Sequence, residues 1–323
     1  MDELTWAKNL AKTELHAHIN GSIGMPDLRK LADLKGVHLP AEIALPGSAG
    51  FSLDDVFALF SKTIYSVVRD AQALQFVVEH VVAAFKRDGV RYLELRSTPK
   101  SLEGMDMDGY VSTVVSAISK AMSENETIRV KFLLSVDRRH DPETASTIVS
   151  LAIKYANLFP SIVVGVDVCG NPACGGIKHL VPSLSRLKLD APTLKLVIHF
   201  AEIETPPEED ELLTILSLNP DRLGHCTFVP DHIMATMRAR KIPIEICLSS
   251  NVVGGTVNSF EAHHLKQLWD SGYPRECLIL CTDDVGIFCS DLSNEYVIAR
   301  RVLGVSREVM EEWAQLVCDK YAR

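Results

Sequence analysis

Two histidines near the start of the chain have a spacing that suits a metal site. His16 and His18 lie in the apolar run Glu14–Ile19, which has the character of a β-strand. Residues i and i+2 of a strand face the same side, so both imidazoles point in one direction. Neutral imidazole nitrogens are donors that zinc prefers in proteins. The pair alone is equally compatible with one packed and one surface histidine.

Two further candidate ligands end later apolar runs. His199 lies in the run Lys195–Ala201, and Asp283 ends the run Cys277–Asp283. If these runs are the fifth and eighth strands of a closed barrel, both residues meet the two N-terminal histidines and leave one position open for water. We therefore predict one Zn²⁺ per chain. Its predicted ligands are His16, His18, His199 and Asp283.

Three more polar residues follow the predicted strands closely. Glu202 comes directly after the fifth strand, and a carboxyl in a dry cleft can act as a general acid when its pKa is raised. The alternative is a solvated loop glutamate. His225 ends the run Arg222–Cys226; a core histidine is the usual interpretation, but its position at a strand end favours catalysis. Asp284 is next to a predicted ligand, and adjacent carboxylates repel unless a cation lies between them, so we expect it to contact substrate.

The elements that must position these residues recur along the whole chain. Short apolar runs alternate with amphipathic helical patterns, for example Ala71–Arg87, Tyr110–Ser123 and Thr144–Asn157. Eight runs with helical crossovers predict an α/β fold, a parallel sheet closed into a (β/α)8 TIM barrel with additional helices. The predicted strands are Glu14–Ile19, Tyr92–Arg96, Lys131–Asp137, Val163–Cys169, Lys195–Ala201, Arg222–Cys226, Ile242–Ser249 and Cys277–Asp283.

Nearly every predicted strand ends in a polar or reactive residue. This favours an active site at the carboxyl face of a barrel. No linker, repeat or shift in composition divides the chain, so we predict a single domain over residues 1–323. Two other histidines, His263 and His264, fall in a helical pattern where adjacent side chains point apart; we expect a surface helix there.

Composition excludes several other classes of protein. The 323 residues include 33 Lys and Arg against 42 Asp and Glu, a net charge of −9, without a basic run. A nucleic-acid polymer or an anionic membrane is therefore an unsuitable partner. The 8 cysteines form no CxxC pair, the N-terminus lacks a signal-peptide pattern, and no apolar run could span a membrane. We expect a reduced, cytoplasmic protein and a monomer.

Five motifs together give a resemblance to a known family. The segments ELHAHINGS, HFAE, RLGH, SSN and TDD, in this order, resemble the adenosine/AMP deaminase family from about Ala11 to Tyr296. The segments YLELRSTPK, LLSVDRR, GVDVCGNP and LSNEY are similar to the adenosine-deaminase-like branch, which deaminates N6-methyl-AMP to IMP and methylamine. The resemblance implies a barrel of the metal-dependent hydrolase type and a purine nucleoside monophosphate as substrate.

The resemblance also implies roles for individual residues. It implies that a zinc-bound hydroxide attacks purine C6, that Glu202 protonates N1, and that His225 orients and deprotonates the zinc-bound water. Asp284 would contact N7, and the backbone N–H of Gly170 would contact N3. The other implied substrate-binding positions are His18, Asn20, Ser97, Thr98, Pro99, Lys100 and Asp137.

The sequence departs from the family at two places. Ala201 precedes Glu202 where the family usually has glycine, and alanine has less backbone freedom. The branch commonly has a histidine in the helix that corresponds to Phe57–Val68, where Tyr65 is nearest here. Deamination of adenosine or adenine, and an inactive barrel that only binds a ligand, are the competing functions. A barrel that had lost catalysis should lack at least one metal ligand or catalytic residue. Here the four predicted ligands and Glu202, His225 and Asp284 are all present.

Overall fold

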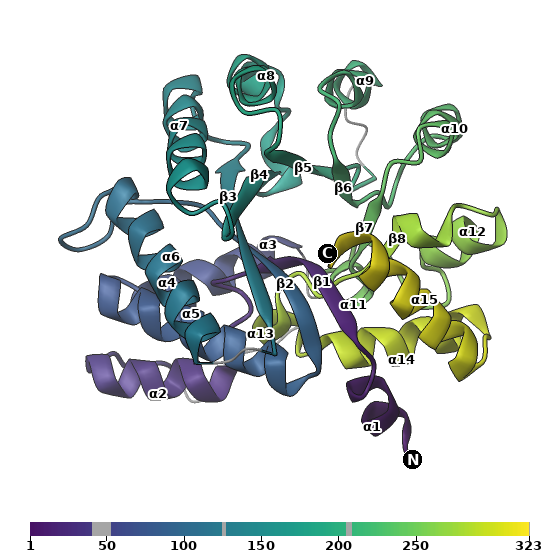
Figure 1. The fold of residues 1–323 in the computed structure, drawn as a ribbon, viewed down its shortest axis with the longest axis horizontal. Helices are drawn as coiled ribbons and strands as arrows, with labels where there is room; N and C mark the ends of the chain where they lie inside the picture. The colour runs from purple at the N-terminus through teal and green to yellow at the C-terminus, as the bar shows by residue number, and fades with distance from the viewer. Residues whose placement is uncertain (41–52, 125–126, 205–208, 323) are drawn as a thin grey trace.

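Eight parallel strands form the centre of the structure (Figure 1). The computed structural model describes residues 1–40, 53–124, 127–204 and 209–322. Each strand pairs with the next along the chain, in the order β1 to β8. The strands are β1 (Lys12–His18), β2 (Val90–Ser97), β3 (Arg129–Asp137), β4 (Val163–Cys169), β5 (Lys195–Phe200), β6 (Arg222–His225), β7 (Ile244–Ile246) and β8 (Leu278–Leu280).

The first and last strands approach each other and nearly close the sheet. Ala17 forms an isolated parallel bridge with Asp283. The backbone N–H of His18 donates to the carbonyl of Asp283 at 2.9 Å, and the N–H of Asp283 donates to the carbonyl of His16 at 2.8 Å. The predicted (β/α)8 barrel is therefore confirmed, and its closure brings the end of the chain's last strand against its first.

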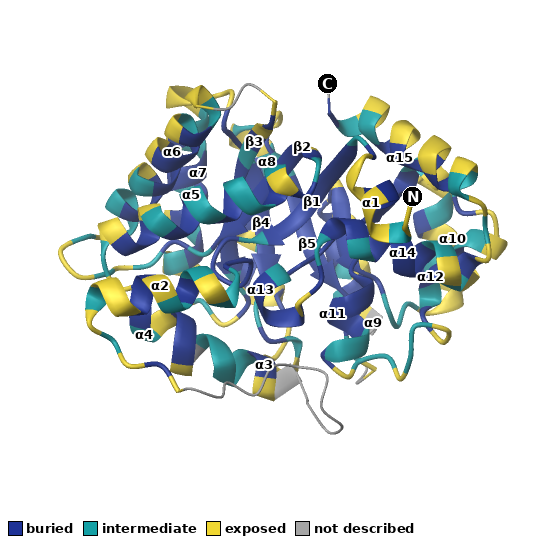
Figure 2. Ribbon diagram, turned by 90° about the horizontal axis from the view of Figure 1, so that it is seen from below, coloured by how far each residue is buried: buried dark blue, intermediate teal, exposed yellow. Residues whose placement is uncertain are grey.

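Helices surround the strands, with their exposed faces outward and their buried faces on the sheet (Figure 2). They are α1 (Glu3–Lys8), α2 (Met25–Lys35), α3 (Leu53–Leu59), the π-helix η1 (Phe60–Ile64), α4 (Tyr65–Val67), α5 (Ala71–Arg87), α6 (Met107–Ser123), α7 (Pro142–Leu158), η2 (Pro172–Cys174), η3 (Lys178–Leu180), α8 (Val181–Asp190), α9 (Glu209–Ser217), α10 (Asp231–Ala239), α11 (Leu248–Val253), α12 (His264–Asp270), η4 (Arg275–Cys277), α13 (Val285–Phe288), α14 (Leu292–Leu303) and α15 (Arg307–Tyr321).

Aspartate caps fix where the long helices begin. Asp70, Asp106 and Asp141 each accept a hydrogen bond from the backbone N–H three residues later, at the starts of α5, α6 and α7. Such caps satisfy one of the free N–H groups of a helix start. The predicted helix Ala71–Arg87 coincides with α5, whereas α6 and α7 begin slightly earlier than the hydrophobic periodicity indicated, because their caps lie earlier.

Two predicted strands are shorter than their apolar runs. The run Ile242–Ser249 contains only β7, since Leu248 already begins the short helix α11. The SSN motif therefore lies on a helix and not at a strand end. The run Cys277–Asp283 contains only β8, and Asp283 follows it in the left-handed region with φ of 63°. Buried apolar helix and strand segments share one hydrophobic pattern, so periodicity could not separate them.

Charged side chains fill part of the barrel interior. Arg96 donates to Asp167 at 2.9 Å and to Glu245 at 2.9 Å, and Arg222 donates to Glu245 at 2.7 Å and pairs with Glu94. All five side chains are buried. Buried charges are tolerated when they are paired and hydrogen-bonded. These side chains therefore form a layer of buried ion pairs inside the barrel.

The eight cysteines are free. Among the described residues, the helices are too short or too polar to cross a lipid bilayer.

Candidate active site

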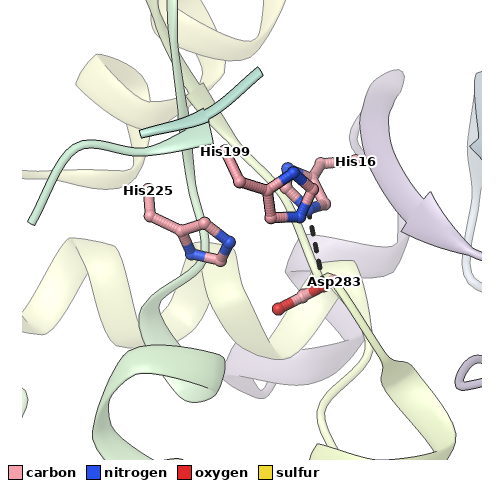
Figure 3. A group of neighbouring side chains, drawn as sticks. All are labelled: His16, His199, His225 and Asp283. Atoms are coloured by element: carbon pink, nitrogen blue, oxygen red, sulfur yellow. Dashed lines mark ion pairs between the residues drawn. The ribbon is translucent and has the colours of Figure 1, made fainter. Parts of the chain in front are cut away.

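The histidines and the aspartate predicted from the sequence come together at the carboxyl ends of the strands. His16, His199, His225 and Asp283 each offer one ligand atom, and these atoms lie within 4.8 Å of one another. Figure 3 shows the three rings and the carboxylate facing one another. His18 lies beside this group: its Nε2 is 3.3 Å from Asp283 Oδ1 and 3.3 Å from His199 Nε2.

Neighbouring groups orient the candidate ligands toward a common centre. His16 Nδ1 is 2.8 Å from Glu245 Oε2, and His199 Nδ1 is 2.9 Å from the carbonyl of Val168. These acceptors place the ring protons on Nδ1 and leave both Nε2 atoms as donors to a metal. His16 Nε2, 3.4 Å from Asp283 Oδ1, has no hydrogen-bond partner among the described residues.

The aspartate is oriented in the same way. Ser250 Oγ donates to Asp283 Oδ2 at 2.7 Å, so Oδ1 is the oxygen that faces His16 and His18. Three imidazole nitrogens and one carboxylate oxygen in one buried cluster fit a metal ion that prefers nitrogen and oxygen donors. The cluster can therefore bind a metal.

Two further carboxyl groups next to this cluster have raised pKa values. Burial, assisted by the charge of Asp283, raises the pKa of Glu202 to about 8. Burial and the same neighbouring charge raise the pKa of Asp284 well above its usual range. A carboxyl that stays protonated in a buried cleft can donate a proton or a hydrogen bond to a bound ligand.

The backbone adopts left-handed conformations at three of the strand ends. Ala201 has φ of 47°, His225 of 60°, Cys226 of 56° and Asp283 of 63°. These values are costly for residues other than glycine and cluster at functional sites, where they direct side chains that regular strands would not. Ala201 thus retains the conformation for which glycine is suited, and Glu202 still lies at the cluster, with Oε1 3.9 Å from His225 Nε2.

A cavity of about 330 Å³ opens onto the cluster. Its polar wall includes most of the predicted substrate-binding residues: His18, Asn20, Ser97, Thr98, Asp137, Gly170, Glu202 and Asp284. Its apolar wall is formed by Val56, Phe57, Phe60, Tyr65 and Phe288. An apolar pocket with a few convergent polar groups is typical of small-molecule sites. Pro99 and Lys100 are not among the residues that line it.

Lys100 instead contacts one of the lining residues. Its Nζ is 3.2 Å from the centroid of the Tyr65 ring, a cation–π contact, and burial lowers its pKa to about 8. Lys100 therefore contacts a residue of the cavity wall and does not line the cavity itself.

Arg139 is a cavity residue that the sequence analysis did not identify. Its Nε and Nη2 donate to the two carboxylate oxygens of Asp137 at 2.8 and 2.6 Å. Asp137 also lies against Gly170, where a Cβ would come within 2.7 Å of Oδ1 and where φ is 100°. Both observations require glycine at position 170, and its backbone can approach a ligand closely. The signal for Arg139 was the adjacent pair of arginines after the third strand.

The orienting residues Asp167 and Glu245 were also missed. Each is a single acidic residue within an otherwise apolar strand, which is itself a signal, since buried charges need partners. The prediction of a surface helix at His263 and His264 was wrong. His263 is buried and caps α12, and His264 Nε2 donates to the carbonyl of His225 at 2.9 Å.

Comparison with known proteins agrees with this geometry. A family model described as adenosine deaminase matches residues 11–319. An N6-methyl-AMP deaminase of Danio rerio is 40% identical over 314 residues, with 94% of this chain and 88% of that protein covered. The crystal structure of the Arabidopsis N6-mAMP deaminase has a TM-score of 0.87 at 35% identity, covering 98% of this chain and 94% of that one.

A second Arabidopsis structure, described as complexed with IMP, has a TM-score of 0.86 at 35% identity and covers 97% of this chain and 92% of that one. Both structural similarities cover nearly the whole chain. The chain therefore belongs to the adenosine deaminase family and is a hydrolytic deaminase that acts on a C–N bond.

Proposed function

We propose that this protein is a zinc-dependent deaminase of 6-substituted purine nucleoside monophosphates, and that it converts N6-methyl-AMP to IMP and methylamine. The observation that carries the proposal is the convergence of three imidazoles and a carboxylate beside the protonated Glu202, all in one cavity. The names of the relatives and the nucleotide in one related structure support the choice of substrate.

His16, His18, His199 and Asp283 would hold the zinc ion. Their nitrogen and oxygen donors suit zinc, and their orientation by Glu245, Val168 and Ser250 is what a bound metal requires. When bound, zinc lowers the pKa of water from 15.7 toward about 7 and thereby supplies hydroxide at neutral pH.

The chain's own residues would bind the purine and move its protons. Glu202, protonated at neutral pH, donates its proton to purine N1 and so makes C6 more susceptible to attack by water. Asp284, whose pKa is raised by burial and by the charge of Asp283, donates a hydrogen bond to N7 in its protonated form. The N–H of Gly170 contacts N3, and the apolar wall around Phe57 and Phe60 keeps bulk water away from the ring.

Deamination of adenosine is the second candidate. The position of Lys100 favours it, because this cation contacts Tyr65 and does not line the cavity in which a 5′-phosphate would bind. Asn20, Ser97 and Thr98 do line that cavity and offer hydrogen-bond donors to a phosphate.

The test is a comparison of kcat/KM for four substrates with the zinc-loaded protein: N6-methyl-AMP, AMP, N6-methyladenosine and adenosine. We expect N6-methyl-AMP to have the highest value and both nucleosides to be far poorer. A higher value for adenosine would replace the nucleotide proposal by the second candidate. No turnover of any of the four would overturn deamination of purines at this site.

A further inference from the structure

The ring of His225 is held from behind by residues that lie outside the cavity. His225 is fully buried, and its Nε2 faces Glu202 without a hydrogen-bond partner among the described residues. Its other ring nitrogen, Nδ1, is 3.5 Å from Nδ2 of Asn251. Oδ1 of Asn251 is in turn 3.1 Å from Nε2 of His263. The three side chains form one continuous chain of hydrogen bonds.

A helix cap fixes the direction of this chain. The backbone N–H of Leu265 donates to Nδ1 of His263 at 3.1 Å, because His263 is the N-cap of α12. Nδ1 of His263 is therefore an acceptor, and in the neutral ring the proton must be on Nε2. That proton is donated to Oδ1 of Asn251, so the amide nitrogen of Asn251 points toward His225.

The opposite orientation of the Asn251 amide is excluded by the same contacts. A flipped amide would place its NH₂ group against the protonated Nε2 of His263, two donors facing each other. Thr256 agrees: its hydroxyl donates to the carbonyl of Asn251 at 3.0 Å and accepts from Nδ2 at 3.3 Å. Both protons of the Asn251 amide thus have acceptors, one of which is Nδ1 of His225.

The backbone of His225 is held by the adjacent histidine. His264 Nε2 donates to the His225 carbonyl at 2.9 Å, and the rings of His263 and His264 stack with centroids 4.3 Å apart. His225 has φ of 60°, a conformation that needs support from its surroundings. The start of α12 therefore positions both the backbone and the ring of His225.

We propose that His263 and Asn251 form a relay that fixes the tautomer of His225, with Nδ1 as acceptor and the Nε2 proton directed into the cavity. In this state His225 donates a hydrogen bond to an oxygen atom bound in the cavity and does not coordinate the metal. His263 and Asn251 are positioning residues, since neither lines the cavity. The inference rests on the function proposed above, because it assigns the role of His225 at that site.

The relay also distinguishes the two histidines that compete for the fourth ligand position. His225 is one of the four residues whose ligand atoms lie within 4.8 Å of one another, and His18 is not, although its Nε2 is 3.3 Å from Asp283 Oδ1. Distance alone would therefore favour His225 as the ligand. A ring nitrogen that carries a proton cannot bind a metal. His225 Nε2 carries one. His18 Nε2, in contrast, lies 3.3 Å from both Asp283 Oδ1 and His199 Nε2, which are atoms of two other predicted ligands. The resemblance implied that His225 both orients and deprotonates the zinc-bound water. Because its Nε2 already carries a proton, His225 can orient this water but cannot deprotonate it.

Two variants test the relay in the full-length, zinc-loaded protein. Asn251→Asp replaces the donor by a group that only accepts, so the proton of His225 should move to Nδ1. His263→Asn keeps an N-cap acceptor for α12 but is too short to reach Asn251. His80→Asn, on the outer face of helix α5, is the matched control. The readouts are the tautomer of His225 by nitrogen-15 NMR of histidine-labelled protein, the zinc content, kcat and KM.

We expect the parent protein and the His80→Asn control to have the proton of His225 on Nε2. Asn251→Asp should move it to Nδ1 and lower kcat by about 10- to 100-fold, the range typical of lost orienting contacts. KM and zinc content should stay near the parent values, and His263→Asn should lower kcat with its stability retained. A proton on Nδ1 in the parent, or a bond from Nε2 to zinc, would overturn the relay.

Unchanged kcat in both folded variants would also overturn it. If Asn251→Asp fails to fold, the parent spectrum and His263→Asn still decide the question. The NMR measurement needs no substrate. Failure of the proposed function, seen as no turnover by the parent, is therefore distinguishable from failure of the relay.

Discussion

Glu202 is the residue whose environment most clearly indicates a chemical task. It is buried beside Asp283, and its pKa is raised to about 8, so it holds a proton at neutral pH. We predict that Glu202→Gln keeps the fold and the metal but lowers kcat by about 10²- to 10⁴-fold, the usual range for a general acid. An amide can still hydrogen-bond to N1 but cannot protonate it. Turnover near the parent rate, with metal content unchanged, would show that the proton comes from elsewhere.

The same group predicts the pH dependence of the reaction. Only the protonated form of Glu202 can donate, and this form is lost as pH rises through about 8. We therefore expect kcat/KM to fall above about pH 8 for both nucleotide and nucleoside substrates. Lys100 also titrates near pH 8, but the loss of its charge should affect only the nucleotide. A decline confined to the nucleotide would assign this limb of the profile to the lysine.

Lys100 offers a second test at the scale of a residue. Its Nζ lies on the ring of Tyr65, which lines the cavity, so Lys100 is the lysine whose charge we test for a contribution to phosphate binding. We predict that Lys100→Ala costs about 1.5–3 kcal/mol in kcat/KM with the nucleotide, the range for a hydrogen bond to a charged group, and little with the nucleoside. Lys154→Ala, which removes an ion pair with Asp108 on the outer helices, is the control. Equal losses on both substrates would mean that Lys100 supports only the local fold.

At the scale of the element, the end of β5 carries a measurable strain. Ala201 has φ of 47°, where a Cβ is unfavourable by about 1–2 kcal/mol. We predict that Ala201→Gly raises the free energy of unfolding by up to about 1 kcal/mol. Ala156→Gly, within helix α7, should instead lower it by roughly 0.5–1 kcal/mol. Denaturant titration measures both. A loss of stability in Ala201→Gly would show that the alanine methyl contributes packing that outweighs the strain.

The sequence predicted the existence and order of all eight strands because each is a short apolar run bounded by turns. It did not predict where the runs at β7 and β8 stop being strand. Local hydrophobicity is the same for a buried strand and the buried helix that follows it, so Ser249 was placed at a strand end and lies on α11. The prediction that His263 lies on a surface helix was wrong for a different reason. Its hydrogen-bond partner Asn251 lies on another helix, and only the fold brings the two side chains together.

At the scale of the whole molecule, the candidate site could be predicted because closure of the barrel determines which strand ends meet. His16, His199 and Asp283 were identifiable one by one, and the neighbourhood of the first and last strands followed from the count of eight. The groups that orient them could not be assigned. Glu245 contacts His16 across the barrel interior, from a different strand, and sequence spacing contains no information about such a contact.

We expect the bound metal to stabilise the folded state of the barrel as well. Its predicted ligands come from β1, from β5 and from the segment after β8. That segment is joined to β1 by the backbone bridge at Ala17 and by two hydrogen bonds from Thr282 to Glu14. A ligand that binds only the folded state stabilises it, by about 4 kcal/mol at a thousandfold excess over its Kd. We predict one zinc per chain in active protein, and a lower thermal midpoint after removal by a chelator.

His16→Ala tests this link between metal and barrel closure. Loss of one ligand should remove both the zinc and the activity. The thermal midpoint of the variant should be low and should no longer respond to zinc or chelator, whereas the parent recovers its midpoint when zinc is restored. Metal analysis together with thermal unfolding measures both effects. Active parent protein with much less than one equivalent of zinc would contradict the assignment. Active parent protein whose midpoint is unchanged by the chelator would show that backbone pairing alone closes the barrel.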